Sequence, residues 1–280
     1  MVSVVIPTYN RAHLLARSIN SVLKQSIDDI EIIVVDDGST DNTQCLIESM
    51  NDKRIKYFKQ EKSGACRARN IGIEESNGEL IAFQDSDDEW FPNKLDSQLK
   101  YLKETNADFT FCEYYKITPE ETKVVPDGLI SKYLTLEQEL EKNYVGTPTI
   151  LMKKEVAKNI RFDETLKRFQ DWDFTIKVLK NNYIVSYQNT PLMNAYDNGN
   201  SITNNQNYNE CYEKFINKNL FLYIKHRKQF GACYMRLARY NSRHNNRKCA
   251  MKYLLRSIKY RPSFKTIMKM AITPLGLWKN

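Results

Sequence analysis

Four acidic residues lie close together at the end of an apolar segment. The stretch IAFQDSDDEW at residues 81–90 contains Asp85, Asp87, Asp88 and Glu89. Carboxylates this close repel one another, so each costs free energy unless water, hydrogen bonds or a cation compensates its charge. The spacing Asp-x-Asp suits two carboxylates that share a hard divalent cation and the phosphates bound to it. Taken alone, the stretch has a simpler interpretation as a solvated acidic loop.

Two further stretches carry groups suited to a nucleotide. In VVDDGSTD, Asp36 and Asp37 follow an apolar strand, where carboxylates can accept hydrogen bonds from a ring N–H or a ribose hydroxyl. In PTYNR, at residues 7–11, the ring of Tyr9 can stack on a base. A strand-to-helix turn and a helix cap at residues 39–41 are the alternative interpretation of these stretches.

The elements that position these groups alternate between strands and helices. Short apolar runs predict strands, and apolar residues spaced three and four apart predict helices. Strands are expected at residues 2–6, 31–35, 54–58 and 79–84, and helices at 12–25, 39–50 and 66–76. This order favours a mostly parallel sheet whose ligands bind beyond the carboxyl ends of the strands, where all three stretches fall. No GxGxxG follows the first strand, which argues against a dinucleotide dehydrogenase.

The second half of the chain changes character after residue 200. Strands are expected at 108–115 and 148–153 and a helix at 171–181, before the polar stretch DNGNSITNNQNYN at 197–209. Beyond that stretch, apolar residues at helical spacing predict three or four helices. We therefore predict one domain over residues 1–205 and a basic helical region over residues 206–280.

The formal charge of +8 hides a strong asymmetry between these regions. Residues 201–280 hold 17 Lys and Arg but only Glu210 and Glu213, whereas residues 1–200 hold 25 basic and 32 acidic residues. The regions are therefore expected to have different partners. The six cysteines form no CxxC pair, and neither a secretion signal nor an apolar run of about 18 residues is visible. These features favour a reducing cytoplasm.

The chain resembles the family 2 glycosyltransferases of the GT-A fold. The motifs PTYNR, VVDDGSTD, GACRARN, FQDSDDEW and FQDWDF occur in the order and approximate spacing of that family, across residues 1–200. The resemblance implies an α/β fold of the GT-A, Rossmann-like type. Its mixed, mostly parallel sheet would have flanking helices, followed here by a helical C-terminal extension. The resemblance also implies metal-dependent, inverting transfer of a sugar from a nucleotide-sugar donor.

The same resemblance assigns roles to individual residues. Asp87 would bind Mn²⁺ or Mg²⁺ bridging the donor diphosphate, and Asp85 would bond the ribose or the sugar. Asp88 and Glu89 would support the loop or cap a helix, and Arg67 is a weaker candidate than Arg69. The nucleotide-sugar-binding residues would be Pro7, Thr8, Tyr9, Asp36, Asp37, Arg69, Asp85 and Ser86.

The last motif departs from the family pattern. The family usually has Glu-Asp there, with the aspartate as catalytic base, whereas this chain has Gln170 before Asp171. An inverting transferase needs a carboxylate to take the proton of the attacking hydroxyl, so Asp171 remains the candidate base. We expect Asp171→Asn to abolish transfer and Gln170→Glu to be tolerated. The missing glutamate is the one feature that favours a non-catalytic binding or scaffold protein with the same fold.

The basic extension predicts a negatively charged partner. An amphipathic helix over residues 263–278, with Lys265 and Lys269 beside Ile267 and Met268, can lie in the headgroup layer of an anionic membrane. A solvated basic face is the alternative. No nucleic-acid-binding motif is visible, which disfavours nucleic acid as the partner.

We therefore predict a hexosyl- or N-acetylhexosaminyltransferase that uses a UDP-sugar. Its acceptor would be a glycan or lipid-linked hydroxyl in the synthesis of capsule, lipopolysaccharide or teichoic acid. A GDP- or dTDP-sugar is the alternative donor. The expected location is the cytoplasm, with peripheral attachment at the inner face of the cell membrane through residues 206–280.

Overall fold

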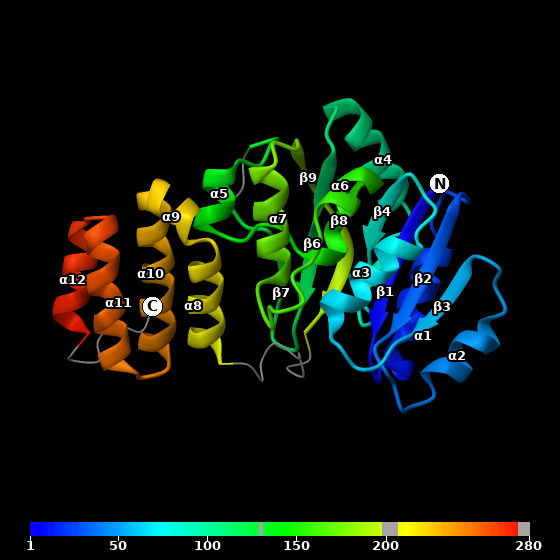
Figure 1. Cartoon of the computed structure of the whole chain (residues 1–280), viewed down its shortest axis with the longest axis horizontal. Helices are drawn as coiled ribbons and strands as arrows, with labels where there is room; N and C mark the ends of the chain where they lie inside the picture. Colours follow the sequence, from blue (N-terminus) through cyan, green and yellow to red (C-terminus); the bar gives the residue numbers. More distant parts are fainter. Residues whose placement is uncertain (129–130, 198–206, 274–280) are drawn as a thin grey trace. The chain divides into compact units, whose positions relative to one another are not determined.

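The computed structural model describes residues 1–128, 131–197 and 207–273 (Figure 1). The chain forms two compact units, which we call the sheet unit and the helical unit. The sheet unit comprises Met1–Thr135 and Tyr144–Asn205, and the helical unit comprises Leu136–Asn143 and Gln206–Asn280. The domain boundary predicted between residues 205 and 206 lies outside the described residues. The inclusion of Leu136–Asn143 in the helical unit has no counterpart in the continuous ranges predicted from the sequence.

The described strands form one nine-stranded sheet in the order β3-β2-β1-β4-β8-β6-β9-β5, with β7 paired to β6 (Figure 1). Strands β1 to β4 pair in parallel, while β8 pairs antiparallel with both β4 and β6. The strands are β1 (Val2–Thr8), β2 (Ile30–Asp36), β3 (Ile55–Lys59), β4 (Leu80–Phe83), β5 (Glu89–Trp90), β6 (Phe109–Ile117), β7 (Thr122–Val125), β8 (Ile150–Lys153) and β9 (Val185–Tyr196). The predicted α/β fold with a mixed, mostly parallel sheet is confirmed.

Helices cover both faces of this sheet. They are α1 (Ala12–Leu23), α2 (Thr43–Met50), α3 (Ala65–Glu75), α4 (Lys94–Thr105), α6 (Lys154–Asn159) and α7 (Gln170–Lys180), with a 3₁₀ turn at Thr147–Thr149. Successive strand residues point to opposite faces, so in β4 Ala82 packs with α1, α2 and α4 while Ile81 and Phe83 pack with α3, α6 and α7. Every residue of β1 and β2 is buried, and most are apolar, because both faces are covered.

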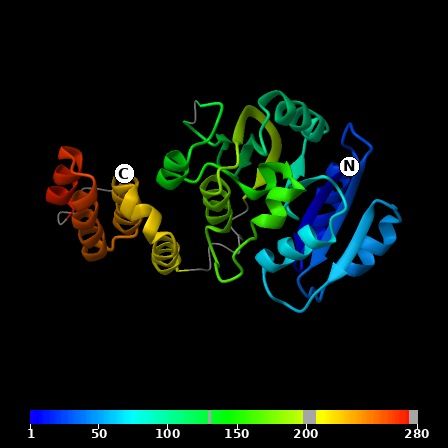
Figure 2. The same cartoon turned by 45° about the horizontal axis from the view of Figure 1, so that its top comes forward.

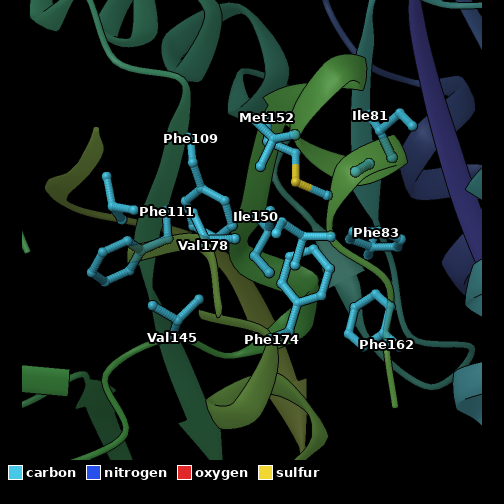
Figure 3. Close-up of a cluster of buried hydrophobic side chains, with 14 of the residues drawn as sticks. Ile81, Phe83, Phe109, Phe111, Val145, Ile150, Met152, Phe162, Phe174 and Val178 are labelled. Carbon is cyan, nitrogen blue, oxygen red and sulfur yellow. The ribbon is translucent and has the colours of Figure 1, made fainter. Parts of the chain in front are cut away.

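Aromatic side chains fill the core between the sheet and helices α6 and α7 (Figure 3). The rings of Phe162 and Phe174 stack with centroids 4.3 Å apart, and Phe83 meets Phe162 edge-on at 5.3 Å. These rings are buried and fix the loop before α7 against the end of β4. The core therefore sets the position of the N-terminus of α7 relative to the strand ends.

Helix α3 lies unusually close to β1. A Cβ atom added to Gly72 would come within 2.2 Å of a Val5 methyl group, so only glycine fits at this contact. The close contact brings the buried side chain of Arg69, one turn earlier on α3, toward the end of β4.

Some elements differ from those predicted. Helix α2 begins at Thr43 rather than near residue 39, because Asp41 accepts hydrogen bonds from the Thr43 N–H at 3.1 Å and from its hydroxyl at 2.5 Å. Of the two roles expected for Asp88 and Glu89, support of the loop fits Glu89 and a helix cap does not, because Glu89 belongs to β5 and pairs with β9. Strands β5, β7 and β9 and helices α4, α5, α6 and α9 had no counterpart in the prediction.

The helical unit is built from α5 (Leu136–Glu141), α8 (Tyr208–Lys218), α9 (Leu220–Lys225), α10 (Arg227–Arg243), α11 (Arg247–Tyr260) and α12 (Phe264–Ile272). Helices α10 and α11 pack side by side, and α12 packs against α11 (Figure 2). The core is aromatic, with Tyr212, Phe215 and Tyr223 fully buried. Arg236 joins α5 to this core by donating to the carbonyl of Glu141 at 2.8 Å and to the Tyr212 hydroxyl at 2.9 Å. Within the described residues, no helix has the length and apolar character needed to cross a membrane.

Candidate active site

Three loops meet at one edge of the sheet because β1 lies between β2 and β4 and all three run in parallel. The loop after β1 begins at Tyr9, the loop after β2 begins at Asp37, and the loop after β4 begins at Gln84. These loops carry the motifs PTYNR, DDGSTD and QDSDD. The structure therefore brings the three stretches together, as their places at strand ends predict.

The first two loops are tied together by hydrogen bonds. The N–H of Asn10 donates to the Ser39 hydroxyl at 2.8 Å, and the N–H of Thr40 donates to the Asn10 side-chain oxygen at 2.8 Å. The N–H of Ala12, at the start of α1, donates to Asp41 at 3.0 Å. Asn10 adopts φ +50°, a conformation that asparagine tolerates better than most residues. The two loops form one rigid platform.

Asp36 and Asp37 are both buried and both hold this platform. One oxygen of Asp36 accepts from the Ser39 N–H at 2.7 Å, and the other accepts from the Tyr57 hydroxyl at 2.6 Å. Asp37 accepts from the N–H groups of Ser63 and Gly64 at 2.6 and 2.8 Å, which fixes the entry to α3. The structure gives both carboxylates a structural task, and their contact with a nucleotide stays a prediction.

The other residues predicted in the PTYNR loop lie differently. Pro7 is buried within β1, opposite Val35 of β2. Thr8 is buried, and its hydroxyl has no hydrogen-bond partner in the part of the chain that the structure describes. The half-buried ring of Tyr9 contacts Lys62, whose ammonium lies 4.1 Å from the ring centroid and donates to the phenol oxygen at 2.8 Å. A base that stacks on Tyr9 would therefore share the ring with Lys62.

Two arginines neutralise the Asp-x-Asp pair. Arg69 donates to Asp85 at 2.8 Å, and Arg11 donates to Asp87 at 2.9 Å. The Arg69 side chain is 8% exposed, whereas that of Arg11 is 22% exposed. Arg11 stands in the PTYNR motif, but the sequence alone gives no sign that its guanidinium reaches a carboxylate 76 residues further along the chain.

The backbone of the acidic loop is held by α1. The Ser18 hydroxyl donates to the carbonyl of Asp85 at 2.9 Å, and Arg17 donates to the carbonyl of Asp87 at 2.5 Å. The guanidinium of Arg17 lies 4.0 Å from the ring centroid of Tyr196, at the end of β9. Ser86, between the two aspartates, is buried with 9% exposure.

Asp88 and Glu89 hold the loop to β9 rather than pointing into a separate site. Asp88 accepts from the backbone N–H of Tyr196 at 3.3 Å, and Glu89 accepts from the Tyr196 hydroxyl at 2.9 Å. Burial, followed by the charges of Asp85 and Asp87, raises the pKa of Asp88 well above its usual range. Burial and the charge of Asp85 likewise raise the pKa of Asp87, although Arg11 opposes this shift.

Arg69 also connects the acidic loop with the start of α7. Its second terminal nitrogen donates to the side-chain oxygen of Gln170 at 3.4 Å, and Gln170 itself donates to the carbonyl of Leu166 at 2.8 Å. Asp171, in the first turn of α7, accepts from the N–H of Trp172 at 2.8 Å. The predicted base thus lies next to the glutamine that shares Arg69 with Asp85.

Tyr114, on β6, is a site residue that sequence reasoning missed. Burial raises the pKa of its hydroxyl, and the charges of Asp171, Asp88 and Asp85 raise it further, so the hydroxyl lies within electrostatic reach of all three. The strand DFTFCEYY was predicted, but its pairing with β8 and β9, which brings it toward the acidic loop, was not.

The acidic loop fits a divalent cation that arrives together with phosphates. Among the described residues, no group of three His, Cys, Asp or Glu side chains is arranged to hold a metal by itself. Mg²⁺ is usually bound by one or two carboxylates plus phosphate and water oxygens, which matches the hard oxygens of Asp85 and Asp87.

Comparison with known proteins gives the family. The model of the family described as glycosyl transferase family 2 matches residues 3–161, which is more than half of the chain. A putative teichuronic acid biosynthesis glycosyltransferase, TuaG of Bacillus subtilis, is 32% identical over 209 residues, covering 74% of this chain and 82% of TuaG. The Escherichia coli UDP-Glc:alpha-D-GlcNAc-diphosphoundecaprenol beta-1,3-glucosyltransferase WfgD is 32% identical over 185 residues, covering 66% of this chain and 72% of WfgD.

Some relatives are much longer than the matched segment. An uncharacterized glycosyltransferase of Rickettsia bellii is 48% identical over 120 residues, which are 42% of this chain and 17% of that protein. The chain likewise covers 31% of the length of a Rickettsia conorii relative.

Solved structures share the fold. Residues 1–349 of TarS from S. aureus match with a TM-score of 0.72 at 20% identity, over 98% of this chain and 87% of that one. The complex of the same protein with UDP matches with a TM-score of 0.60 at 21% identity, over 98% and 77%. The mannosyltransferase PcManGT from Pyrobaculum calidifontis, in complex with GDP-Man and Mn²⁺, matches with a TM-score of 0.59 at 16% identity, over 99% and 81%. The predicted GT-A fold is confirmed.

Proposed function

The chain belongs to glycosyltransferase family 2, and on this premise we propose that it transfers a sugar from a UDP-sugar to a hydroxyl group of a glycan or lipid-linked acceptor. The reaction would serve the synthesis of a cell-surface polysaccharide. The observation that carries the proposal is the position of Arg69, which contacts both Asp85 of the acidic loop and Gln170 beside Asp171. One buried side chain thereby links the candidate donor site to the candidate base.

The comparisons support a uridine nucleotide. WfgD is named for a UDP-Glc donor, and TarS was solved with UDP. A GDP-sugar stays the alternative because PcManGT was solved with GDP-Man and because carboxylate hydrogen bonds alone do not select uracil. WfgD and TuaG also support a bacterial surface glycan as the product, since they are named for a diphosphoundecaprenol acceptor and for teichuronic acid.

The strand order suggests how a donor lies across the site. Asp36 and Asp37 follow β2, the PTYNR loop follows β1, and the acidic loop follows β4. A nucleotide base near Asp37 and Tyr9 would therefore place its diphosphate across the end of β1 and its sugar near Asp85. A cation held by Asp87 would supply Lewis-acid stabilisation of the departing nucleoside diphosphate.

Asp171 is the proposed base of an inverting displacement. As the acceptor oxygen forms its bond to the anomeric carbon, the bond from that carbon to the diphosphate breaks, and the hydroxyl proton passes to the carboxylate of Asp171. Asp171 sits in the first turn of α7, where the Trp172 N–H bonds one of its oxygens and fixes its orientation. Tyr114 keeps its proton, because burial and the charges of Asp171, Asp88 and Asp85 raise its pKa.

A surface of the helical unit supports attachment to an anionic membrane, which would bring the enzyme to a lipid-linked acceptor. One exposed stripe of α11, which we call the α11 stripe, contains Lys248, Lys252, Leu255, Arg256 and Lys259 at helical spacing. Its three lysines form no ion pair among the described residues. Ile267 and Met268 of α12 are about half exposed, at 53% and 50%. Part of the tail predicted to bind the membrane, residues 274–280, lies outside the described residues.

The decisive experiment separates donor binding from transfer. We expect Asp171→Asn to lower UDP-sugar turnover by about a thousandfold or more, since general-base catalysis contributes roughly 10²–10⁴-fold, while UDP binding with Mn²⁺ stays within about twofold. The matched control is Gln170→Glu, which keeps a partner for Arg69 and is expected to keep most of the activity. Isothermal titration and a nucleoside diphosphate release assay supply the two readouts. Near-normal turnover in Asp171→Asn would show that another group is the base.

A further inference from the structure

The two arginines at the acidic loop are held in different ways. Arg69 is buried and bonds Gln170 as well as Asp85, so its position is fixed from two sides. Arg11 pairs with Asp87 at 2.9 Å, and both side chains of this pair remain partly exposed, at 22% and 32%. An ion pair with this exposure is weak and exchanges its partner easily.

Arg11 is not required to hold the backbone of the acidic loop. The carbonyls of Asp85 and Asp87 are bonded by Ser18 and Arg17 of α1. Tyr196 bonds Asp88 and Glu89 from the other side. Among the described residues, the side chain of Arg11 forms a hydrogen bond only with the carboxylate of Asp87.

The place of Arg11 is also where an anion would lie. It follows the end of β1, and β1 lies between β2, which carries Asp36, and β4, which leads to Asp87. A diphosphate that connects a base at the β2 loop with a cation at Asp87 must cross this position. A guanidinium binds phosphate oxygens in a two-pronged geometry at least as well as it binds one carboxylate oxygen.

We propose that Arg11 is an exchangeable counter-ion of Asp87 that the divalent cation displaces and the donor diphosphate then captures. This inference rests on the proposed function. In the nucleotide-free protein Arg11 neutralises Asp87 and competes with the cation for the same carboxylate. When donor and cation bind together, the Arg11 guanidinium turns to the diphosphate. The divalent cation would then take the place of the guanidinium beside the Asp87 carboxylate. Cation and nucleotide binding are therefore coupled: each is weak without the other.

This exchange predicts that Arg11→Gln changes the affinities for Mn²⁺ and for UDP in opposite directions. Without nucleotide, Mn²⁺ should bind the variant about five- to tenfold more tightly than it binds the natural protein, because its competitor is gone. In saturating Mn²⁺, UDP should bind about tenfold more weakly, because its phosphates lose a partner. A purely structural role of Arg11 would weaken both affinities.

The test uses the full chain, with Mn²⁺ binding followed by the electron paramagnetic resonance signal of the free ion and UDP binding by calorimetry. Arg54→Gln is the matched control, since Arg54 pairs with Asp52 at 2.8 Å with similar exposure, at 34% and 25%, in the turn before β3. Both affinities should stay unchanged in that variant. Asp87→Asn should abolish the Mn²⁺ dependence of UDP binding.

Two outcomes would overturn the inference. Unchanged or weaker Mn²⁺ binding in nucleotide-free Arg11→Gln would mean that Arg11 does not compete with the cation. If Mn²⁺ did not change the UDP affinity of the natural protein, Arg11 would remain paired with Asp87 when UDP binds. The proposed use of a UDP-sugar would not be affected by that result. Failure of UDP to bind at all, with Mn²⁺ bound normally, would instead count against the proposed donor.

Discussion

In the sheet unit several charged side chains of the candidate site are buried and paired, whereas the charged side chains of the α11 stripe in the helical unit lie on the surface. Asp36, Asp37 and Arg69 are each less than 10% exposed, and each has protein partners for its charged group. On α11 the lysines of the α11 stripe are exposed and unpaired within the described residues. A buried charge must be satisfied by its own chain, which fixes its geometry, while an exposed charge remains available to a partner.

The cores of the two units also differ in the side chains that they pack. The sheet unit packs mainly aliphatic side chains of β1 and β2 between its helices. The helical unit packs tyrosines whose hydroxyls need partners, such as Tyr212 with Arg236 at 2.9 Å and Tyr253 with Glu213 at 2.9 Å. The few polar groups that the helical unit buries thus serve its own packing, which leaves its positive charge on the surface.

The largest effect is expected when the exposed lysines of the α11 stripe are removed and the buried charges of the sheet unit are left in place. Changing Lys248, Lys252 and Lys259 together to Gln should weaken binding to vesicles with anionic headgroups by about a hundredfold, since each lysine near such a surface contributes roughly 1 kcal/mol. Thermal stability should change little, because none of the three is buried. Flotation with vesicles of mixed neutral and anionic lipid measures the partition.

The matched control removes three exposed lysines from the sheet unit. Lys53, Lys103 and Lys158 are exposed on other elements, and their change to Gln should leave vesicle binding nearly unchanged. If both triple variants weaken binding equally, the attraction follows net charge and the α11 stripe has no special role. If the natural protein fails to float with anionic vesicles at low salt, the membrane is not its partner.

The next test compares one glycine from each unit. A Cβ on Gly72 would meet a Val5 methyl at 2.2 Å, and a Cβ on Gly231 of α10 would meet the Arg261 Cβ at 2.4 Å. Each change to Ala should destabilise its own unit by about 2 kcal/mol, as overpacking of a tight contact does. Hydrogen exchange should rise in α3 and β1 for Gly72→Ala, and in α10 and α11 for Gly231→Ala.

Gly146→Ala serves as the control for this pair. An added Cβ there would have no neighbour closer than 3.6 Å, an ordinary contact with the Tyr114 ring, so exchange should stay unchanged. Faster hydrogen exchange in both units of either single variant would show that the units unfold together. The two units would then differ in where their charges lie but not in how they unfold.

Much of the sheet unit could be predicted from the sequence. The β-branched runs of β1 and β2 and the helical spacing in α1 are local signals, and their alternation is enough to place three motifs at one edge. The family motifs then identified the fold. What local signals do not contain is the tertiary partner of each side chain. Asp36 was expected to face a nucleotide, yet Tyr57 on the neighbouring strand β3 takes one of its oxygens.

The contacts that organise the acidic loop were also beyond the sequence. Arg17 and Ser18 lie on α1, about 70 residues before the carbonyls that they bond, and no periodicity relates the two segments. The return of β9 beside β6, which brings Tyr196 to Asp88, depends on packing of the whole sheet. The same holds for the packing of α5 with the helical unit, since a short helix between two strands carries no mark of its tertiary partner.

Lys94 is the exception within the sheet unit, because its buried charge has no acidic partner among the described residues. It is fully buried on α4, donates to Gln98 at 2.6 Å and lies 3.9 Å from the ring centroid of Trp90. Burial lowers the pKa of Lys94 to about 8. Below pH 8 the lysine is charged in both states, so the folded protein carries the full cost of burying the charge. Between pH 8 and the higher pKa of the unfolded chain, the unfolded state binds more protons, and stability from this group rises with pH.

Replacement of Lys94 by Met tests whether a buried charge without an acidic partner destabilises the sheet unit. At pH 7 the variant should be more stable by about 1 kcal/mol, since removal of the charge outweighs the unpaired oxygen left on Gln98. The advantage should shrink as pH rises from 8 to 10 and the natural lysine loses its proton. Urea unfolding at several pH values measures the difference. Lys100→Met, on the exposed face of the same helix, should show no such pH dependence. A constant difference between Lys94→Met and the natural protein would mean that folding does not lower the pKa of Lys94.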